Sequence, residues 1–168
     1  MLAFVLDAWA DVPPDRSVVA PIVVYSPAVA AIRAAELGSG ITFALQDDPR
    51  GTADAVRAGL VGVPDDVDEI LVLSGDVPLV LGPALQAVLE QRRLDDAAIA
   101  LASVFAAAPG SLGRVVRSEF GSVERIVEAK DATAEELDSN EVNAGCYAFD
   151  ARAACPRGRP DRERGRLR

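Results

Sequence analysis

The feature that most constrains the fold is an alternation of short apolar runs with amphipathic segments. Apolar runs rich in β-branched residues are typical of strands buried on both faces, and the segments between them follow a 3.6-residue period. The expected strands are 21–26, 41–45, 69–76 and 97–104, and the expected helices are 2–10, 27–37, 52–61 and 82–93. This alternation predicts an α/β protein with a mostly parallel sheet.

The pattern changes after the loop at 108–113. The stretch "GRVVRSEFGSVERIVEAKD" alternates about "EFGS", as a β-hairpin does, and residues 131–137 and 141–150 are expected to form a short helix and another buried strand. From Arg152 the chain is rich in Arg, Pro and Gly, and it is expected to be disordered. We therefore expect one domain over residues 1–151 and a separate tail over 152–168.

Composition excludes several classes of function. The formal net charge is −9, and the acidic residues are concentrated in 1–151, which argues against a nucleic-acid-binding surface. Histidine is absent, so histidine-based nucleophilic triads are excluded and a divalent cation would need oxygen ligands. No apolar run approaches the ~18 residues that span a bilayer. We expect a cytoplasmic protein that binds neither nucleic acid nor membrane.

Asp76 is the strongest single candidate for chemistry. In an open α/β sheet, ligands bind beyond the carboxyl ends of the strands, and Asp76 ends the apolar strand 69–76 directly after Gly75. A carboxylate at that place suits Mg²⁺, which prefers one or two carboxylates together with substrate phosphates. An aspartate that caps the next turn fits the spacing equally well.

A second candidate group follows the strand at 41–45. Gln46 offers one amide donor group and one acceptor, the pair needed to recognise the edge of a nucleobase. Gly51 permits a close approach of the backbone, and Thr52 can cap the following helix. Taken alone, the stretch is more typical of a surface turn that ends in a helix cap.

Two further polar residues lie at expected strand ends. Glu128 in "VEAKDA" and Asn143 in "EVNAG" could hold the hydroxyl and acetamido groups of a sugar by hydrogen bonds. As isolated residues they would more often be exposed strand ends.

Taken together, these stretches resemble the uridyltransferase domain of N-acetylglucosamine-1-phosphate uridyltransferase, one of the sugar-nucleotide pyrophosphorylases. The matching segments, in order, are "MLAFVLDA", "ALQDDPRGTADAV", "ILVLSGDVPL", "LGRVVRSEFGSVERIVEAKDATAEEL" and "NEVNAGCYAFDA". Five ordered motifs over residues 1–151 are far more specific than any one of them. The resemblance implies the Rossmann-like nucleotidyltransferase fold of the nucleotide-diphospho-sugar transferases.

The resemblance also implies a reaction, UTP + N-acetylglucosamine 1-phosphate → UDP-N-acetylglucosamine + pyrophosphate, and cell-wall precursor synthesis. Asp76 would then be the catalytic ligand of Mg²⁺. The resemblance also implies oligomers, which full-length members of the family form. The other implied substrate-binding residues are Gln46, Gly51 and Thr52 for the uracil, Ser74 and Gly75 beside the metal ligand, and Gly113, Glu128 and Asn143 for the amino sugar. Asp54 stands where the family often has histidine, and because it lies on the expected helix, we give it little weight.

The family also has a first strand and a Gly-rich loop with basic residues, which this sequence does not contain. Cationic groups on a transferring phosphoryl group are each worth about 10²-fold in rate or more, so impaired activity is expected. The tail after Ala151 departs from the family pattern and would fit an out-of-frame segment. The alternatives are a non-catalytic fragment that binds uridine nucleotides or UDP-sugars, and a nucleotidyltransferase for another sugar 1-phosphate.

Overall fold

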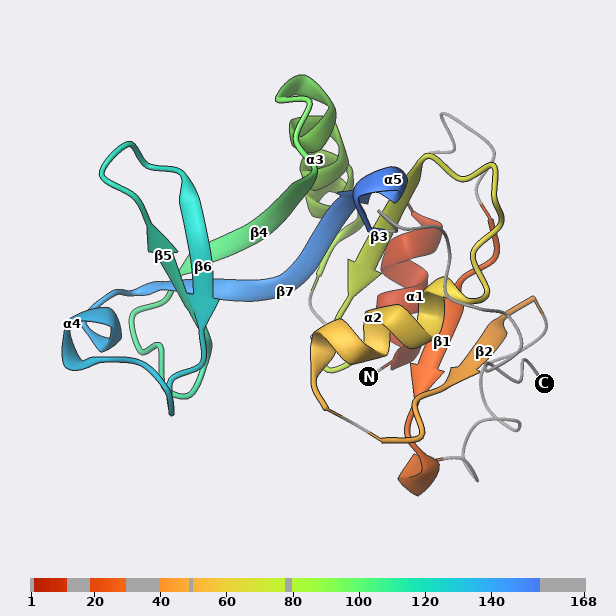
Figure 1. The fold of residues 1–168 in the computed structure, drawn as a ribbon, viewed down its shortest axis with the longest axis horizontal. Coiled ribbons are helices and arrows are strands. Elements are labelled where there is room, and N and C mark those ends of the chain that lie inside the picture. The colour runs from red at the N-terminus through yellow and green to blue at the C-terminus, as the bar shows by residue number, and fades with distance from the viewer. Residues whose placement is uncertain (1, 12–18, 30–39, 49, 78–79, 155–168) are drawn as a thin grey trace.

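The computed structural model describes residues 2–11, 19–29, 40–48, 50–77 and 80–154 of the 168-residue chain (Figure 1). The helices are α1 (Leu2–Ala10), the 3-10 helix η1 (Pro27–Val29), α2 (Thr52–Leu60), α3 (Gly82–Leu94), α4 (Ala134–Leu137) and α5 (Ala151–Ala154). The strands are β1 (Ile22–Tyr25), β2 (Thr42–Leu45), β3 (Glu69–Leu73), β4 (Ile99–Phe105), β5 (Arg114–Arg117), β6 (Val123–Val127) and β7 (Glu141–Asp150).

Most elements lie where the sequence periodicity predicts them. The hairpin about "EFGS" is confirmed as β5 and β6, and Gly121 in its turn has a φ of +82°, a conformation that favours glycine. The helix expected over 27–37 begins as the 3-10 helix η1, and its later residues lie outside the described residues. Helix α5 continues to Ala154, and the rest of the tail also lies outside the described residues.

The strands form two sheets. Strands β1 and β2 pair in parallel, and β3, β4, β5, β6 and β7 form a second sheet in which each pairing is antiparallel. No strand among the described residues joins β1 to β3.

The expectation of a mostly parallel sheet is therefore not confirmed. Strand β7 pairs with β3 along one edge and with β4 along the other, antiparallel to both. Strands β3 and β4 thus run in the same direction, as a strand–helix–strand unit predicts, but β7 lies between them. The alternation of strands and helices along the sequence predicts that β3 and β4 run in the same direction. It carries no information about β7, which begins 36 residues after β4 ends.

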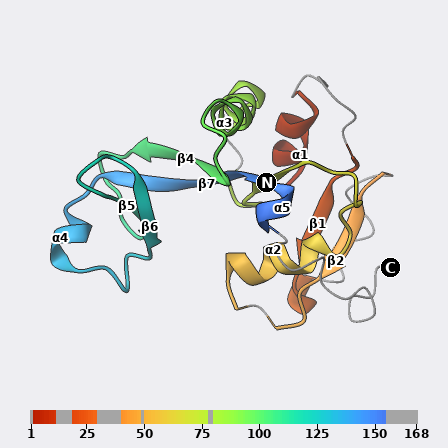
Figure 2. The ribbon, with the colours of Figure 1, turned by 45° about the horizontal axis from the view of Figure 1, so that its top comes forward.

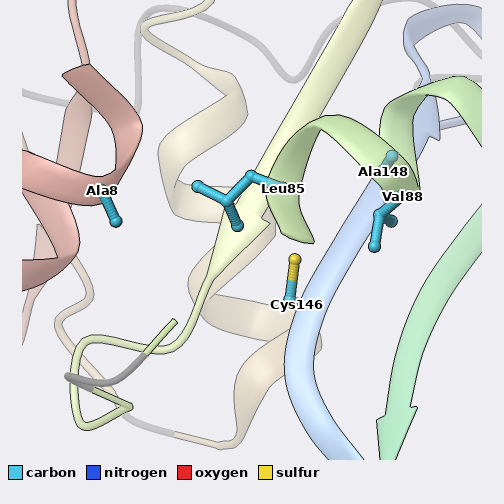
Figure 3. Packing of buried hydrophobic residues seen from close by; sticks show 5 residues of the cluster. All are labelled: Ala8, Leu85, Val88, Cys146 and Ala148. Atoms are coloured by element: carbon cyan, nitrogen blue, oxygen red, sulfur yellow. The ribbon is translucent and has the colours of Figure 1, made fainter. Parts of the chain in front are cut away.

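The described core lies between helices α1 and α3 and one face of the second sheet (Figure 3). Its buried members are Ala8 on α1, Leu85 and Val88 on α3, and Cys146 and Ala148 on β7. Leu85 and Ala148 are fully buried. Because Cys146 and Ala148 alternate with Tyr147 along β7, the Tyr147 side chain projects from the opposite face of the sheet.

Strands β4 and β7 extend away from α1 and α3, so that β4 ends and β7 begins beside the β5–β6 hairpin and α4 (Figures 1 and 2). Glu141, at the start of β7, holds this extension together: its carboxylate accepts hydrogen bonds from Arg117 on β5 at 2.6 and 2.8 Å and from Ser103 on β4 at 2.6 Å. These bonds, led by those from Arg117, hold the pKa of Glu141 below its usual range against the opposing effect of burial. No described helix is both long and apolar enough to cross a membrane.

Candidate functional site

The chain leaves β3 through a tight turn made by Ser74, Gly75 and Asp76, called here the β3 turn. The Val77 amide donates to the Ser74 carbonyl oxygen at 3.3 Å, and the Ser74 amide donates to the carbonyl oxygen of Gly145 in β7 at 2.9 Å. Gly75 and Asp76 are exposed. The turn therefore leaves the Asp76 carboxylate open to solvent at the carboxyl end of β3.

Gly145 gives β7 a local irregularity opposite this turn. Its φ is +69°, and a Cβ placed on it would lie 2.6 Å from Ser74 Oγ and 3.0 Å from Ser74 Cβ. The register between β4 and β7 shifts at the same point, between Leu101 and Ser103. Sequence reasoning did not identify Gly145, although a glycine inside an apolar strand pattern is a known sign of a bulge or a close backbone approach.

Three of the expected sugar-binding residues come together. The backbone amide of Asn143 donates to the Gly113 carbonyl oxygen at 2.9 Å, and a Cβ placed on Gly113 would lie 3.9 Å from Glu128 Oε1. Gly113 directly precedes β5, Glu128 directly follows β6, and Asn143 lies on β7. These three residues and Tyr147 are called the Asn143 cluster.

Tyr147 is a member that sequence reasoning missed, because it lies inside an apolar run. The Asn143 side chain donates from Nδ2 to the Tyr147 hydroxyl and accepts at Oδ1 from the Gly145 amide at 3.1 Å. Burial raises the pKa of Tyr147, the hydrogen bond from Asn143 opposes this, and the charge of Glu128 adds to the rise. The phenol therefore stays protonated near neutral pH and keeps an O–H that can donate.

The loop before Gly113 is held by a buried arginine. Arg114 is only 4% exposed, and its guanidinium donates to the carbonyl oxygens of Leu112 and, at 3.1 Å, of Gly110. Within the described residues its guanidinium bonds only to these carbonyl oxygens and to no carboxylate, and its Nε has no hydrogen-bond partner. Its charge is stabilised by backbone carbonyl dipoles, which fixes the loop that leads to the Asn143 cluster.

Gln46 forms a third group, the Gln46 cluster, with Gly51 and Asp54. Gln46 Nε2 donates to the Gly51 carbonyl oxygen at 3.3 Å and to Asp54 Oδ2 at 3.2 Å. Gly51, with a φ of 117°, is the residue that precedes α2. Thr52 is the first residue of that helix and its side chain makes no capping bond, so the expectation that Thr52 caps the helix is wrong. Asp54, to which the sequence pattern gave little weight, accepts a hydrogen bond directly from Gln46.

The described residues hold no group of three or more Cys, Asp or Glu side chains that could enclose a metal ion. Mg²⁺ does not need such an enclosure, because it is usually held by one or two carboxylates plus substrate phosphates and water. The exposed Asp76 carboxylate, with no hydrogen bond or ion pair from the described residues, fits that mode of binding.

The structure thus joins two of the three groups directly. The Asn143 cluster is connected to the β3 turn, since Asn143 bonds to Gly145 and Gly145 bonds to Ser74. The Gln46 cluster belongs to the other sheet. Gln46 follows β2, and its backbone amide donates to the Tyr25 carbonyl oxygen of β1 at 2.9 Å. Figure 1 draws the arrowheads of β1 and β3 toward the same side of the view.

Comparison with known proteins assigns a family. Residues 16–163 match the family model described as nucleotidyl transferase. The chain is 37% identical over 163 residues to the bifunctional protein GlmU of Mycobacterium avium (strain 104), covering 91% of this chain and 32% of that protein. It is 44% identical over 122 residues to the bifunctional protein GlmU of Anaeromyxobacter sp. (strain K), covering 73% and 25%. The chain thus spans between a quarter and a third of the length of these curated relatives.

Solved structures show the same fold at lower identity. The structure of CMP:2-keto-3-deoxy-manno-octonic acid synthetase complexed with CTP superposes with a TM-score of 0.63 at 19% identity, covering 91% of this chain and 64% of that one. A Thermus thermophilus structure described as mannose-1-phosphate geranyltransferase gives a TM-score of 0.58 at 24% identity, covering 90% and 48%. With the family match over most of its length, the chain belongs to the nucleotidyl transferase family, and its fold is the α/β fold of that family.

Proposed function

We propose that this chain carries the substrate-recognition residues of a uridyltransferase that acts on N-acetylglucosamine 1-phosphate. In the reaction, a phosphate oxygen of the sugar phosphate attacks the α-phosphorus of UTP. The bond from that phosphorus to the oxygen bridging the α- and β-phosphates breaks, and pyrophosphate leaves with the electron pair. The protein positions the two substrates and neutralises charge, and it needs no nucleophile of its own.

The observation that carries the proposal is the Asn143 cluster. Three segments, each 15 residues from the next in the sequence, bring Gly113, Glu128 and Asn143 together, and Tyr147 adds a hydroxyl. The cluster offers a carboxylate acceptor, an amide and a phenol beside a glycine without a side chain. Hydroxyl and acetamido groups of an amino sugar are matched by such a set of acceptors and donors.

The other two groups supply the nucleotide side of the proposed site. Gln46, with Gly51 and Thr52 at the start of α2, would bind the uracil. Ser74 and Gly75 would lie against the phosphates, where Gly75 leaves room for them. Asp76 would hold Mg²⁺, which when bound neutralises phosphate charge.

The domain assignment is also a proposal. We propose that residues 1–151 form part of a nucleotidyltransferase domain and that 152–168 are a tail outside it. The similarity to the GlmU proteins supports the assignment of UTP and N-acetylglucosamine 1-phosphate as substrates, at 37–44% identity.

Isothermal titration with UDP-N-acetylglucosamine and a coupled assay for pyrophosphate release test the proposal together. The titration is expected to detect binding that Asn143→Ala weakens by about tenfold, the effect of losing one or two ligand hydrogen bonds. Asn140→Ala is the matched control, because Asn140 is an exposed asparagine just before β7 whose side chain makes no hydrogen bond with the described residues. Its affinity should equal that of the wild type.

The outcomes separate the alternatives. Binding together with pyrophosphate release supports the proposed enzyme. Binding without release supports a non-catalytic UDP-sugar-binding chain instead. A chain that binds UDP-glucose as tightly as UDP-N-acetylglucosamine would contradict the assignment of the amino sugar, and absence of binding to either would contradict the proposal as a whole.

A further inference from the structure

We propose that Asp54 selects the nucleobase by fixing the orientation of the Gln46 side-chain amide. This inference rests on the proposed function, in which Gln46 binds the base, and it adds a residue that the family resemblance does not supply. Asp54 is a positioning residue here, because it acts on the ligand through Gln46.

The orientation of Gln46 follows from its two neighbours. Both the Gly51 carbonyl oxygen and Asp54 Oδ2 are acceptors, at 3.3 and 3.2 Å from Gln46 Nε2. If the amide were turned by 180°, its own carbonyl oxygen would face these two oxygens, one of which carries negative charge. Hydrogen-bond networks of this kind decide between the two orientations of an amide. Gln46 therefore turns its NH₂ group toward α2.

The carboxylate that imposes this orientation is itself held in place. Asp54 Oδ1 lies 3.4 Å from Arg57 Nη1 and 3.6 Å from Arg50 Nη2, and the Asp54 side chain is only 19% exposed. Oδ1 is thus occupied by the two arginines, while Oδ2 faces Gln46. Asp54 also lies in the first turn of α2, where the helix dipole favours a negative charge.

The fixed orientation leaves Gln46 one group for a ligand. Both N–H bonds of Nε2 have protein acceptors, and no described residue donates to Oε1. The amide can therefore offer a base only an acceptor. Uracil carries an N–H at position 3, which can donate to Gln46 Oε1. Cytosine bound in the same register places its bare N3 against Oε1, so two acceptors face each other, and its one donor on that edge, the 4-amino group, lies at the neighbouring position.

The size of the expected selection follows from the cost of that mismatch. A buried polar group left without its partner costs about 1–3 kcal/mol, which corresponds to roughly 5- to 150-fold in affinity. We expect the wild type to bind UTP at least about tenfold more tightly than CTP. Without the Asp54 carboxylate only the uncharged Gly51 carbonyl oxygen opposes a turn of the Gln46 amide, so the preference should fall to within about threefold.

Isothermal titration with UTP and CTP, each with Mg²⁺, measures this preference in the wild type, Asp54→Ala and Asp54→Asn. Asp54→Asn keeps the shape of the side chain and removes the charge, so it covers the case in which the alanine variant is too unstable to titrate. Asp47→Ala is the matched control, since it removes one negative charge from the loop between β2 and α2 at an exposed residue whose side chain makes no hydrogen bond to the Gln46 side chain. It should keep the wild-type preference.

A second readout needs no nucleotide. The side-chain NH₂ signals of Gln46 in a ¹⁵N–¹H NMR spectrum, assigned with Gln46→Ala, should move in both Asp54 variants and stay in place in Asp47→Ala. A preference for UTP that survives in both Asp54 variants would overturn the role of Asp54 and leave the proposed function standing. A wild type that binds neither nucleotide would overturn the proposed function, and base selection with it.

Discussion

Replacement of Gly145 by alanine tests whether the contact between β7 and the β3 turn depends on the absence of a side chain. The φ of Gly145 is +69°, and an alanine in that region costs about 1–2 kcal/mol in backbone energy. The new Cβ would also lie 2.6 Å from Ser74 Oγ and 3.0 Å from Ser74 Cβ. Forced displacement of this kind adds about 1–3 kcal/mol, so the total is about 3 kcal/mol.

Gly121→Ala is the matched control for this prediction. Its φ is +82°, so it carries a similar backbone cost, but nothing lies within 4 Å of the position that its Cβ would occupy. We expect Gly121→Ala to cost about 1 kcal/mol in the free energy of unfolding. The difference of about 2 kcal/mol between the two variants isolates the steric contact with Ser74.

Urea denaturation followed by circular dichroism measures both variants. With a denaturant slope of roughly 2 kcal/mol/M, the midpoint should fall by about 1.5 M for Gly145→Ala and about 0.5 M for Gly121→Ala. Combining Gly145→Ala with Ser74→Gly removes both close contacts, and the double variant should recover most of the 2 kcal/mol difference. Equal midpoints for the two alanine variants, or no recovery in the double variant, would refute the steric argument.

Three further predictions concern stability. The hydrogen bonds from Arg117 hold the pKa of Glu141 below its ordinary value. The ionised Glu141 carboxylate therefore stabilises the folded state fully above the pKa that Glu141 has in the unfolded chain, and this stabilisation is lost as the pH falls through its lower pKa in the folded protein. Urea midpoints measured from pH 7 to 3 should consequently fall more steeply in the wild type than in Glu141→Gln. Leu85→Ala should cost about 3 kcal/mol because Leu85 is fully buried, whereas Leu94→Ala, at 81% exposure, should cost less than about 0.5 kcal/mol in the same measurement. Thr133→Ala removes the capping box of α4 and should weaken that helix by about 1 kcal/mol, seen as faster amide hydrogen exchange within it.

The sequence predicts the elements of this fold better than their arrangement. Period and composition placed β3, α3, β4 and β7 within a few residues, because burial on one or both faces leaves a local signature. The position of β7 between β3 and β4 has no local signature, since it depends on which strand edges remain free after the strand–helix–strand unit has formed. The hairpin was predictable because its turn residues lie next to each other in the chain.

The candidate site shows the same division. Asn143 and Glu128 were identified as polar residues at strand ends, and the structure brings both beside Gly113. Tyr147 was missed because an aromatic residue in an apolar run looks like core, and only the position of Asn143 shows that its hydroxyl has a partner. Asp54 received little weight because it lies on a helix. It is eight residues from Gln46 in the sequence, and its side chain nevertheless accepts a hydrogen bond from the Gln46 side chain.

Both polar clusters form where the backbone departs from regular structure at a glycine. Gly51 has a φ of 117° and directs its carbonyl oxygen to Gln46, while Gly145 has a φ of +69° and donates its amide to Asn143. The Gly51 carbonyl oxygen also accepts the first hydrogen bond of α2, from the Ala55 amide at 3.1 Å, and Gly145 lies where the register between β4 and β7 shifts. At each glycine a backbone group holds one side of a side-chain amide. The remaining amide atoms gain a fixed direction, which is what discrimination between similar ligands requires.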